Sequence, residues 1–322
     1  LSIIAEVAHA AAHLSAQTIE AILTNPQDER WSQVAMPDAQ TAPELNKVYR
    51  SALWLCLIPP AIQKSILNAI KSGTDALDFS AKQELHADHL AFSLQGLLPH
   101  TAIKHLNVSH LNFSSKGLLV IATLPLVSLK LKNNGNNIAW DKIDLNSMKA
   151  LGENPHLRAL NISGNNLGLK AVEALAKNKT LLRLNISFNP LQFAGIGKLA
   201  QMNLISLNVA NTVTQFDKLS AQSAIQKIAT MHALRELNLG NLGLQDAQWL
   251  QLVGSKIERL NASRNAMTSL DFTKNLSTLT YINIFGNRNL AQESNQEISA
   301  KGVIVKDNDL REKSFALRKL WL

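Results

Sequence analysis

The sequence predicts an α/β solenoid, a stack of repeats in which each repeat contributes one short parallel strand and one helical segment. Three observations support this fold class. Leu and Asn are over-represented, with 53 and 30 of the 322 residues. Aromatic residues make up only 5% of the chain. One apolar pattern returns from residue 103 onward, and such a period is typical of repeat architectures.

The repeating pattern is Leu-x-x-Leu-x-Leu-x-x-Asn-x-Leu, and its clearest copies begin at Leu157 and Leu181. Copies begin at residues 103, 126, 157, 181, 204, 234, 257 and 279, with spacings of 23, 31, 24, 23, 30, 23 and 22 residues. A degenerate first copy begins at Thr74. This pattern at this period is the signature of a leucine-rich repeat. We therefore expect about eight or nine repeats over residues 74–290.

Each position of the pattern has a physical role. Apolar residues at the fourth and sixth positions alternate as in a strand with one buried face. The Asn at the ninth position carries a donor and an acceptor, so when buried it can satisfy the backbone of the turn in its own coil and in the next. In the other copies Leu111, Thr212 and Leu242 replace this Asn, and we expect those turns to be less regular. The expected structural ladder consists of Asn134, Asn165, Asn189, Asn265 and Asn287.

The second half of each repeat has an apolar residue about every third or fourth position, which predicts a helix. Because the helical side is wider than the strand side, the stack should form a horseshoe with a concave parallel sheet and convex helices. A solenoid also needs its ends covered. We expect a helical N-terminal cap over residues 1–73, with helices over 2–23, 43–57 and 61–70. A C-terminal cap is expected over residues 291–322, with a last strand over 298–305 and a helix over 309–322.

The helical half of one repeat, residues 168–176, reads Gly-Leu-Lys-Ala-Val-Glu-Ala-Leu-Ala. It resembles the ribonuclease-inhibitor-like repeats, and among them the GALA-type repeats of Legionella-like bacterial secreted effectors. This resemblance implies a virulence effector that a bacterium secretes into the host cell cytosol, where it binds a host protein or another effector. The short C-terminal tail is similar to export signals for type IV secretion. Without secretion, the expected location is cytoplasmic.

An alternative function rests on residues 57–67, which read Leu-Ile-Pro-Pro-Ala-Ile-Gln-Lys-Ser-Ile-Leu. This segment resembles the opening of an F-box, which runs Leu-Pro-x-Glu and then has Ile and Leu one helical turn apart. The resemblance implies a ubiquitin-ligase adaptor that would bind a Skp1-like protein through residues 57–70. Ala61 stands at the acidic position, and the first repeat strand follows almost at once, so the match covers about a dozen residues.

The sequence carries no motif that predicts catalysis. His9 and His13 share a helical face, but no carboxylate lies between them as in a metalloprotease helix. Five of the nine histidines lie between His86 and His110. We favour exposed, unrelated histidines there, with a metal or pH-sensing cluster as the alternative. Cys56 is the only cysteine, which excludes an intramolecular disulfide framework, and its apolar neighbours suit an inert core thiol. We expect no enzyme, no cofactor and no metal site.

Exposed Arg and aromatic residues on the concave face indicate a partner. The third, fifth, seventh and eighth residues of each repeat should face outward there, and Arg with aromatics is typical of interface hot spots. The two long repeats add rim loops after Asn134 and Thr212, which carry Trp140 and Phe216 and are either partner contacts or tolerated insertions. The other residues expected to bind a partner are Arg183, Phe188, Arg259, Arg264, Tyr281, Phe285 and Arg288.

The fifth position is Asn in seven of the eight registered copies, with Lys130 as the exception. Parallel strands would place these amides about 4.8 Å apart. We expect a stacked amide ladder, and a polar recognition stripe is the alternative. The seven residues are Asn107, Asn161, Asn185, Asn208, Asn238, Asn261 and Asn283.

The formal net charge of +8 is unevenly distributed. Residues 1–102 hold 6 basic and 10 acidic side chains, a charge of −4, whereas residues 103–322 hold 26 and 14, a charge of +12. Many of the lysines fall on the helical side, where a solvated face is expected, and the concave arginines alternate with Asn and aromatics. This favours an acidic or mixed protein surface over nucleic acid, whose binding would fall steeply with salt. We expect a monomer without a nucleic-acid or membrane partner.

Overall fold

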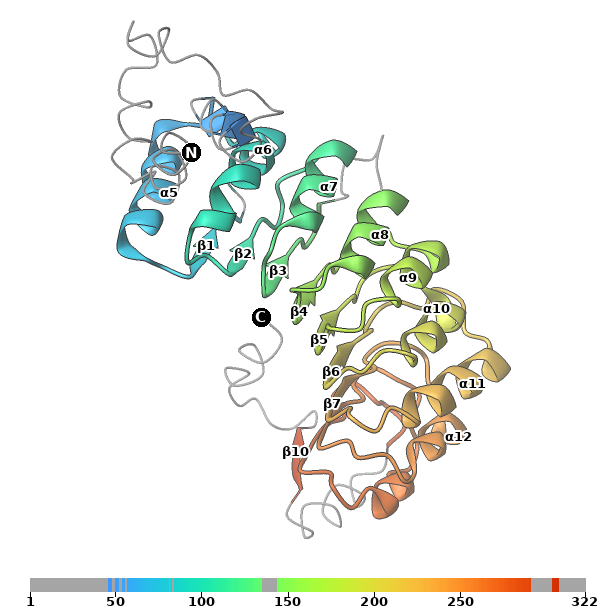
Figure 1. The fold of residues 1–322 in the computed structure, drawn as a ribbon. Helices are drawn as coiled ribbons and strands as arrows, with labels where there is room; N and C mark the ends of the chain where they lie inside the picture. The colour runs from blue at the N-terminus through green and yellow to red at the C-terminus, as the bar shows by residue number, and fades with distance from the viewer. Residues whose placement is uncertain are drawn as a thin grey trace, which may run out of the picture. The chain divides into compact units, whose positions relative to one another are not determined.

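A computed structural model of the chain describes residues 46–47, 50–51, 54–55, 57–80, 82, 84–134, 144–290 and 303–306. The chain divides into two compact units, residues 1–130 and 131–322. Both units repeat one theme, a three-residue strand followed by a turn and a helical segment (Figure 1). The predicted α/β fold, with parallel strands and alternating helices, is confirmed in each unit.

Among the described residues of the first unit, three strands pair in parallel in chain order. Their central residues Leu77, Leu106 and Leu129 are in register and buried. The strands are β1 (Ala76–Asp78), β2 (His105–Asn107) and β3 (Ser128–Lys130). The helical segments are α5 (Pro60–Ser72), α6 (Ala87–Leu97), the short 3-10 helix η1 (Leu98–His100) and α7 (Ser115–Thr123).

Helix α5 has sequence signals at both ends. Pro60 is its first residue, where the missing N–H has no helical partner to lose. Gly73 ends the helix in the left-handed region, with φ of +66°, where glycine has no Cβ to clash. The helix therefore covers the expected range 61–70 and extends slightly beyond it. In the range 43–57, the described residues 46–47, 50–51 and 54–55 are helical as well.

Among the described residues of the second unit, seven strands pair in parallel in chain order. In β4 to β9 the central residue is at most 3% exposed, while at least one flanking residue in most strands keeps some exposure. Burial of one such leucine contributes about 1.5–3 kcal/mol relative to leaving it in water. The strands are β4 (Ala159–Asn161), β5 (Arg183–Asn185), β6 (Ser206–Asn208), β7 (Glu236–Asn238), β8 (Arg259–Asn261), β9 (Tyr281–Asn283) and β10 (Ile304–Lys306).

The helical segments of the second unit lie across the core from its strands (Figure 1). Two of them begin at an aspartate that caps the helix, because Asp144 and Asp217 accept the N–H groups of Ser147 and Ser220, each at 2.8 Å. The segments are α8 (Leu145–Glu153), α9 (Leu169–Leu175), α10 (Gln192–Leu199), α11 (Lys218–Ala229), α12 (Asp246–Trp249) and the 3-10 helices η2 (Leu250–Leu252) and η3 (Asp271–Asn275).

The helical half shortens toward the C-terminal repeats, which corrects the expectation of a helix in every repeat. Helix α11 has 12 residues, α12 has 4, and the copy that begins at residue 257 has only the five-residue 3-10 helix η3. Repeat length alone does not account for this, because the 23-residue copy that begins at residue 181 holds the eight-residue α10. A 3-10 helix rises further per residue than an α-helix, so it covers the same distance with fewer residues.

The ends of the chain are only partly described. The expected last strand over residues 298–305 is seen as β10, which pairs in parallel with β9. The helices expected over residues 2–23 and 309–322 lie outside the described residues, as do His9, His13 and Cys56. In the part of the chain that the structure describes, no helix has the length and apolar character that a bilayer crossing requires.

Candidate functional site

The ninth-position Asn is buried and joins each coil to the one before it. Asn189 is 1% exposed. Its Nδ2 donates to the carbonyl oxygen of Ile162 in the preceding coil at 3.0 Å, and to two carbonyls of its own coil at 2.8 and 3.1 Å. Its Oδ1 accepts the N–H groups of Asn165 and Leu167, also in the preceding coil, at 2.9 and 3.0 Å. The same arrangement recurs at Asn165, Asn265 and Asn287.

This direction differs from the sequence prediction, which placed the second set of bonds in the next coil. The reason lies in the backbone. The N–H groups of each turn point toward the following coil, as in the 3.0 Å bond from Phe188 to the carbonyl of Ala210. The acceptor that satisfies such N–H groups must therefore reach back from the following coil. Asn134 is buried too, and its N–H donates to Oδ1 of Asn165 at 2.7 Å.

The fifth-position Asn residues each form a hydrogen bond within their own coil, and Asn107 also donates through Nδ2 to Oδ2 of Asp78 in the preceding coil at 3.0 Å. In all seven copies the side-chain oxygen accepts the N–H of the seventh residue, at 3.0 to 3.2 Å. Asp78, at the same place in the degenerate first copy, accepts the N–H of Ser80 at 2.8 Å. This is an Asx turn, in which a short polar side chain caps the bend after the strand. These bonds do not decide between the expected stacked amide ladder and the recognition stripe, and both stay predictions.

The eighth residue of every registered copy is in the left-handed region. In three copies it is Asn and in two it is Gly, which both tolerate this conformation. The copies with Leu111, Thr212 and Leu242 at the ninth position have the same conformation at the eighth, so the expectation of less regular turns is wrong there. The φ values are +66° at His110, +52° at Asn133, +69° at Gly164, +57° at Phe188, +57° at Asn211, +56° at Asn241, +55° at Arg264 and +79° at Gly286.

Phe188 and Arg264 do not suit this backbone position, yet both are exposed there. Phe188 has 63% of its surface exposed, and among the described large apolar residues of the second unit only Leu219 and Ile304 are more exposed. Left-handed geometry costs a residue with a Cβ about 1–2 kcal/mol. Because both side chains are exposed, burial in the core does not offset this strain. An exposed residue in strained geometry points to a role outside the fold.

The predicted binding residues fall into two groups. The first, which we name the strand column, comprises Arg183, Arg259 and Tyr281, each the first residue of its strand. Arg183 Nη1 lies 3.7 Å from Oε2 of Glu236, and the Arg259 guanidinium lies 4.9 Å from the centre of the Tyr281 ring. Burial raises the pKa of Tyr281 above its ordinary value, although the Arg259 charge acts in the opposite direction. The cations of this column are therefore compensated within the protein.

The second group, which we name the turn ridge, comprises Phe188, Arg264, Phe285 and Arg288. These residues lie in the turns that follow the strands. Among the described residues, the ion pairs involve neither Arg264 nor Arg288. Phe285 is 41% exposed. The turn ridge thus presents aromatic surface and positive charge that the described part of the molecule leaves without compensation.

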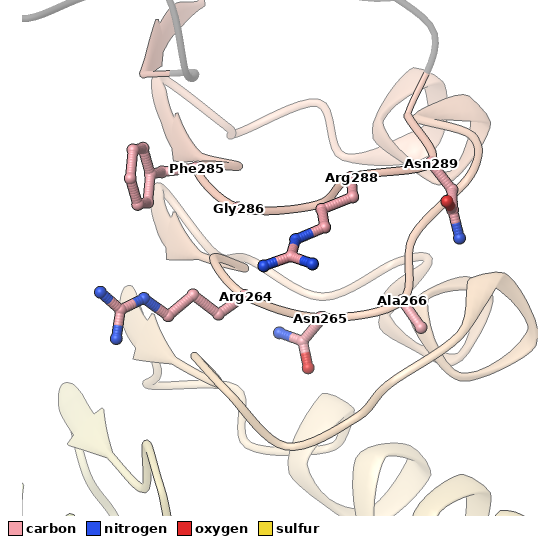
Figure 2. Close-up of a pocket in the computed structure, with 7 residues that line it drawn as sticks. All are labelled: Arg264, Asn265, Ala266, Phe285, Gly286, Arg288 and Asn289. Atoms are coloured by element: carbon pink, nitrogen blue, oxygen red, sulfur yellow. The ribbon is translucent and has the colours of Figure 1, made fainter.

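A pocket of about 750 Å³ lies at the C-terminal end of the turn ridge. Figure 2 shows Arg288 pointing into the space between two turns, while Arg264 and Phe285 extend to the same side of the strands. Asn265 and Gly286 form part of the floor, and sequence reasoning missed Ala266 and Asn289, which have no distinctive signal in the pattern. The lining residues are Arg264, Asn265, Ala266, Phe285, Gly286, Arg288 and Asn289.

The second rim loop is anchored to the coil before it. Gln192 Nε2 donates to Oγ1 of Thr214 at 2.7 Å, and Gln192 Oε1 accepts the Thr214 N–H at 3.2 Å. Phe216 packs edge-on against Phe193, with ring centres 5.8 Å apart, and lies over Gly243. Phe216 is 39% exposed, so it is partly used by the fold. Trp140, in the first rim loop, lies outside the described residues.

In the first unit, His86 and His89 are neighbours. Their rings stack with centres 4.1 Å apart, so the expectation of unrelated histidines is wrong for this pair. His105 Nε2 lies 3.9 Å from a carboxylate oxygen of Asp75. Within the described ranges, no group of three or more His, Cys, Asp or Glu residues is arranged to hold a metal ion.

The segment that resembles an F-box is largely engaged in the fold of the first unit. Ile58, Ile62, Ile66 and Leu67 are buried, whereas Leu57 is 59% exposed. An apolar side chain already buried within its own unit cannot also bind a second protein without unfolding. No observation in this segment favours the adaptor function.

The family comparison agrees with this geometry. A family model described as "Leucine Rich repeat" matches residues 153–176 and 177–200. These two stretches run through α9 and β5 into α10, and they have the same strand, turn and helix as their neighbours. The fold is that of the leucine-rich repeats.

Three solved leucine-rich-repeat structures have low similarity to this chain. An internalin, InlF, from Listeria monocytogenes has a TM-score of 0.43 and 17% identity, over 68% of this chain and 66% of that one. An internalin C2 from the same species has a TM-score of 0.40 and 18% identity, over 60% and 74%. TLR13, solved in a complex with ssRNA13, has a TM-score of 0.45 and 19% identity, over 75% and 34%. The chain thus spans only part of each of these proteins. No curated protein sequence matches it.

Proposed function

We propose that this chain is a non-enzymatic leucine-rich-repeat module that binds another protein through the turn ridge. One observation carries the proposal. Phe188 and Arg264 stand exposed at a left-handed position where five of the other six registered copies have Asn or Gly and the sixth has His110. Selection for stability alone would favour Asn or Gly there. A binding role accounts for side chains that the fold itself disfavours.

The chemistry of the turn ridge suits a protein partner. Arg and Phe are residues of interface hot spots, where an aromatic anchor is combined with a guanidinium that forms several hydrogen bonds. Phe188 and Arg264 lie three coils apart, about 14 Å along the ridge at the usual strand spacing. This length fits a short segment or a helix of a partner. Arg264 and Arg288 form no ion pair among the described residues. The surface of a partner that complements them is therefore acidic or mixed in charge.

We further propose that the protein is a bacterial effector that binds a host protein or another effector in the host cell cytosol. Support comes from residues 168–176, whose sequence resembles GALA-type repeats and whose central part forms α9. Delivery by type IV secretion belongs to the same proposal and rests on the resemblance of the C-terminal tail. The protein is expected to act as a monomer and without a cofactor.

Affinity capture from host-cell lysate with matched variants tests the binding surface. The ridge variant carries Phe188→Asn and Arg264→Asn, which install the residue found at the same position in three other copies. Arg183→Gln in the strand column and Lys179→Gln on an exposed loop are the controls. We expect the ridge variant to lose at least ten-fold in partner recovery, while both controls retain the partner and all variants keep the native circular dichroism spectrum.

Three results would contradict this proposal. If the native chain and the ridge variant recover equal amounts of the partner, the turn ridge is not the binding surface. Recovery of a Skp1-like protein, lost on changing Leu57 and not on changing the ridge, would support the adaptor function instead. Recovery that disappears after nuclease treatment, with steep salt dependence, would indicate nucleic acid.

A further inference from the structure

We propose that the pocket at the end of the turn ridge binds a phosphorylated side chain of the protein partner. This inference rests on the proposed function and names the chemistry that one part of the ridge recognises. The pocket lies between the turn that contains Arg264 and the turn that contains Phe285 and Arg288 (Figure 2).

Charge is the first argument. Arg264 and Arg288 both line the pocket and both are exposed, and neither has an acidic partner among the described residues. A phosphate monoester carries about 1.5 to 2 negative charges at neutral pH. It therefore matches two guanidinium groups, whereas a single carboxylate would leave one of them uncompensated. Guanidinium also binds phosphate oxygens through two parallel hydrogen bonds, which gives geometry as well as charge.

Space is the second argument. The pocket of about 750 Å³ has room for a phosphate group together with the side chain that carries it. Gly286 keeps one wall open, because a Cβ at that residue would come within 3.0 Å of Cγ of Arg264 and the φ of +79° there disfavours other residues. The stem of Arg264 thus lies against Gly286, and its exposed guanidinium, which extends away from Arg288 in Figure 2, would have to turn to reach a ligand beside Arg288.

The surroundings of the pocket are the third argument. Phe285 provides an aromatic face at the edge of the pocket, against which the apolar part of a phosphorylated residue can pack, and Asn289 adds a neutral amide donor. The arginines of the strand column are less suited to bind a phosphate, because Arg183 lies beside Glu236 and Arg259 lies over the Tyr281 ring. Among the arginines predicted to bind a partner, those of the turn pocket are therefore the ones open to an oxyanion.

Titration of the full chain with small probes tests this site. The probes are inorganic phosphate, phosphoserine and phosphotyrosine with both termini blocked, and blocked glutamate. Binding is followed through the NMR signals of the arginine Nε–H groups. We expect the signals of Arg264 and Arg288 to shift to saturation with at least one blocked phospho-amino acid, and blocked glutamate to bind at least ten-fold more weakly.

Variants separate a built site from general attraction to positive charge. Arg288→Gln should lower the affinity for the phosphorylated probe at least ten-fold. Arg288→Lys should lower this affinity less, and Lys179→Gln should leave it unchanged. Equal affinity for glutamate, or binding that does not respond to Arg288→Gln, would overturn the assignment. Binding of inorganic phosphate with no gain from the amino-acid part would reduce the site to an adventitious anion contact and would overturn it as well.

Capture after phosphatase treatment of the lysate distinguishes this inference from the proposed function. If treatment abolishes capture by the native chain, the phosphate inference is supported. If capture persists after treatment but is still lost in the Phe188→Asn and Arg264→Asn variant, the turn ridge binds a protein and the phosphate inference is wrong. If the ridge variant captures the partner like the native chain, the proposed function fails.

Discussion

The eighth and ninth residues of a repeat are adjacent in sequence but differ in burial and hydrogen bonding, as Phe188 and Asn189 show. The side chain of Asn189 is buried and forms five hydrogen bonds, three of which join it to the preceding coil. Phe188, directly before it, is exposed in left-handed geometry and contributes nothing to the core. The fold restricts the ninth position by hydrogen bonding and the eighth only by backbone conformation. A repeat can therefore vary the eighth residue for binding at a modest cost, while a change at the ninth affects the joint between coils.

The largest expected effect is at the ninth position. Asn189→Ala removes the side chain that satisfies two buried N–H groups and donates to three carbonyls, so we expect a loss of about 3–5 kcal/mol in the free energy of unfolding. Denaturation by urea, followed by circular dichroism, measures it. Asn203→Ala, at an exposed site, is the control and should change stability by less than about 0.5 kcal/mol. A loss below about 1 kcal/mol at Asn189 would remove the contrast between the two positions.

A moderate effect of opposite sign is expected at the eighth position. Phe188→Asn should raise the free energy of unfolding by about 1 kcal/mol, because Asn tolerates the left-handed backbone that Phe disfavours. Phe188→Ala is the matched control, since it removes the ring but retains a residue unsuited to this conformation. The same urea experiment compares the two variants. Equal stabilities would show that φ at this position carries no measurable strain.

The smallest effect concerns the fifth position, whose side chain caps its own turn at the surface. Burial acts to raise the pKa of Asp78, but hydrogen bonds from Ser80 and Asn107 and the charge of Lys130 outweigh it, so the pKa lies below the ordinary 3.8. A carboxyl with a lowered pKa in the folded state stabilises the fold above its unfolded-state pKa, and this stability is lost as pH falls through the folded value.

Asp78→Asn keeps the turn cap that Asn provides in seven other copies but has no charge to titrate. We therefore expect the midpoint of urea unfolding to fall less steeply below pH 4 in the variant than in the native chain, with near-equal midpoints at pH 7. Measurements of the midpoint from pH 7 to pH 3 test this. Parallel curves for the two proteins would show that the carboxylate contributes nothing beyond the amide.

The repeat made most of the strand architecture predictable. The registered leucines are the central residues of β2 to β8, and the described strand positions coincide with the fourth position of each copy. A period of this kind reports directly which residues face inward, because the strand alternates its side chains. The pattern carries less information on the convex side, where copies of similar length hold either an α-helix such as α10 or only a short helical segment. The sequence predicts a helix in every repeat, whereas α12 has four residues and η3 is a 3-10 helix.

The candidate site was predictable only as a set of exposed residues. The sequence places Arg183, Arg264 and Arg288 in one class, and the structure separates them by their neighbours. Glu236 stands in the same strand column as Arg183, two coils away, and only the register of the sheet shows that the two side chains meet. The left-handed backbone at the eighth position has a sequence signal, since Asn or Gly occupies this position in five of the eight registered copies.

The backward direction of the Asn bonds has a consequence for how the chain folds as it is synthesised. The side chain of a ninth-position Asn finds its partners in its own coil or in the coil made before it, as Asn189 does with Ile162 and Asn165. A newly made coil can therefore bond through this side chain to the coil before it, whereas the N–H groups of its own turn are satisfied only when the next coil is added. The coils with Leu111, Thr212 and Leu242 lack the amide and join the coil before them without these bonds.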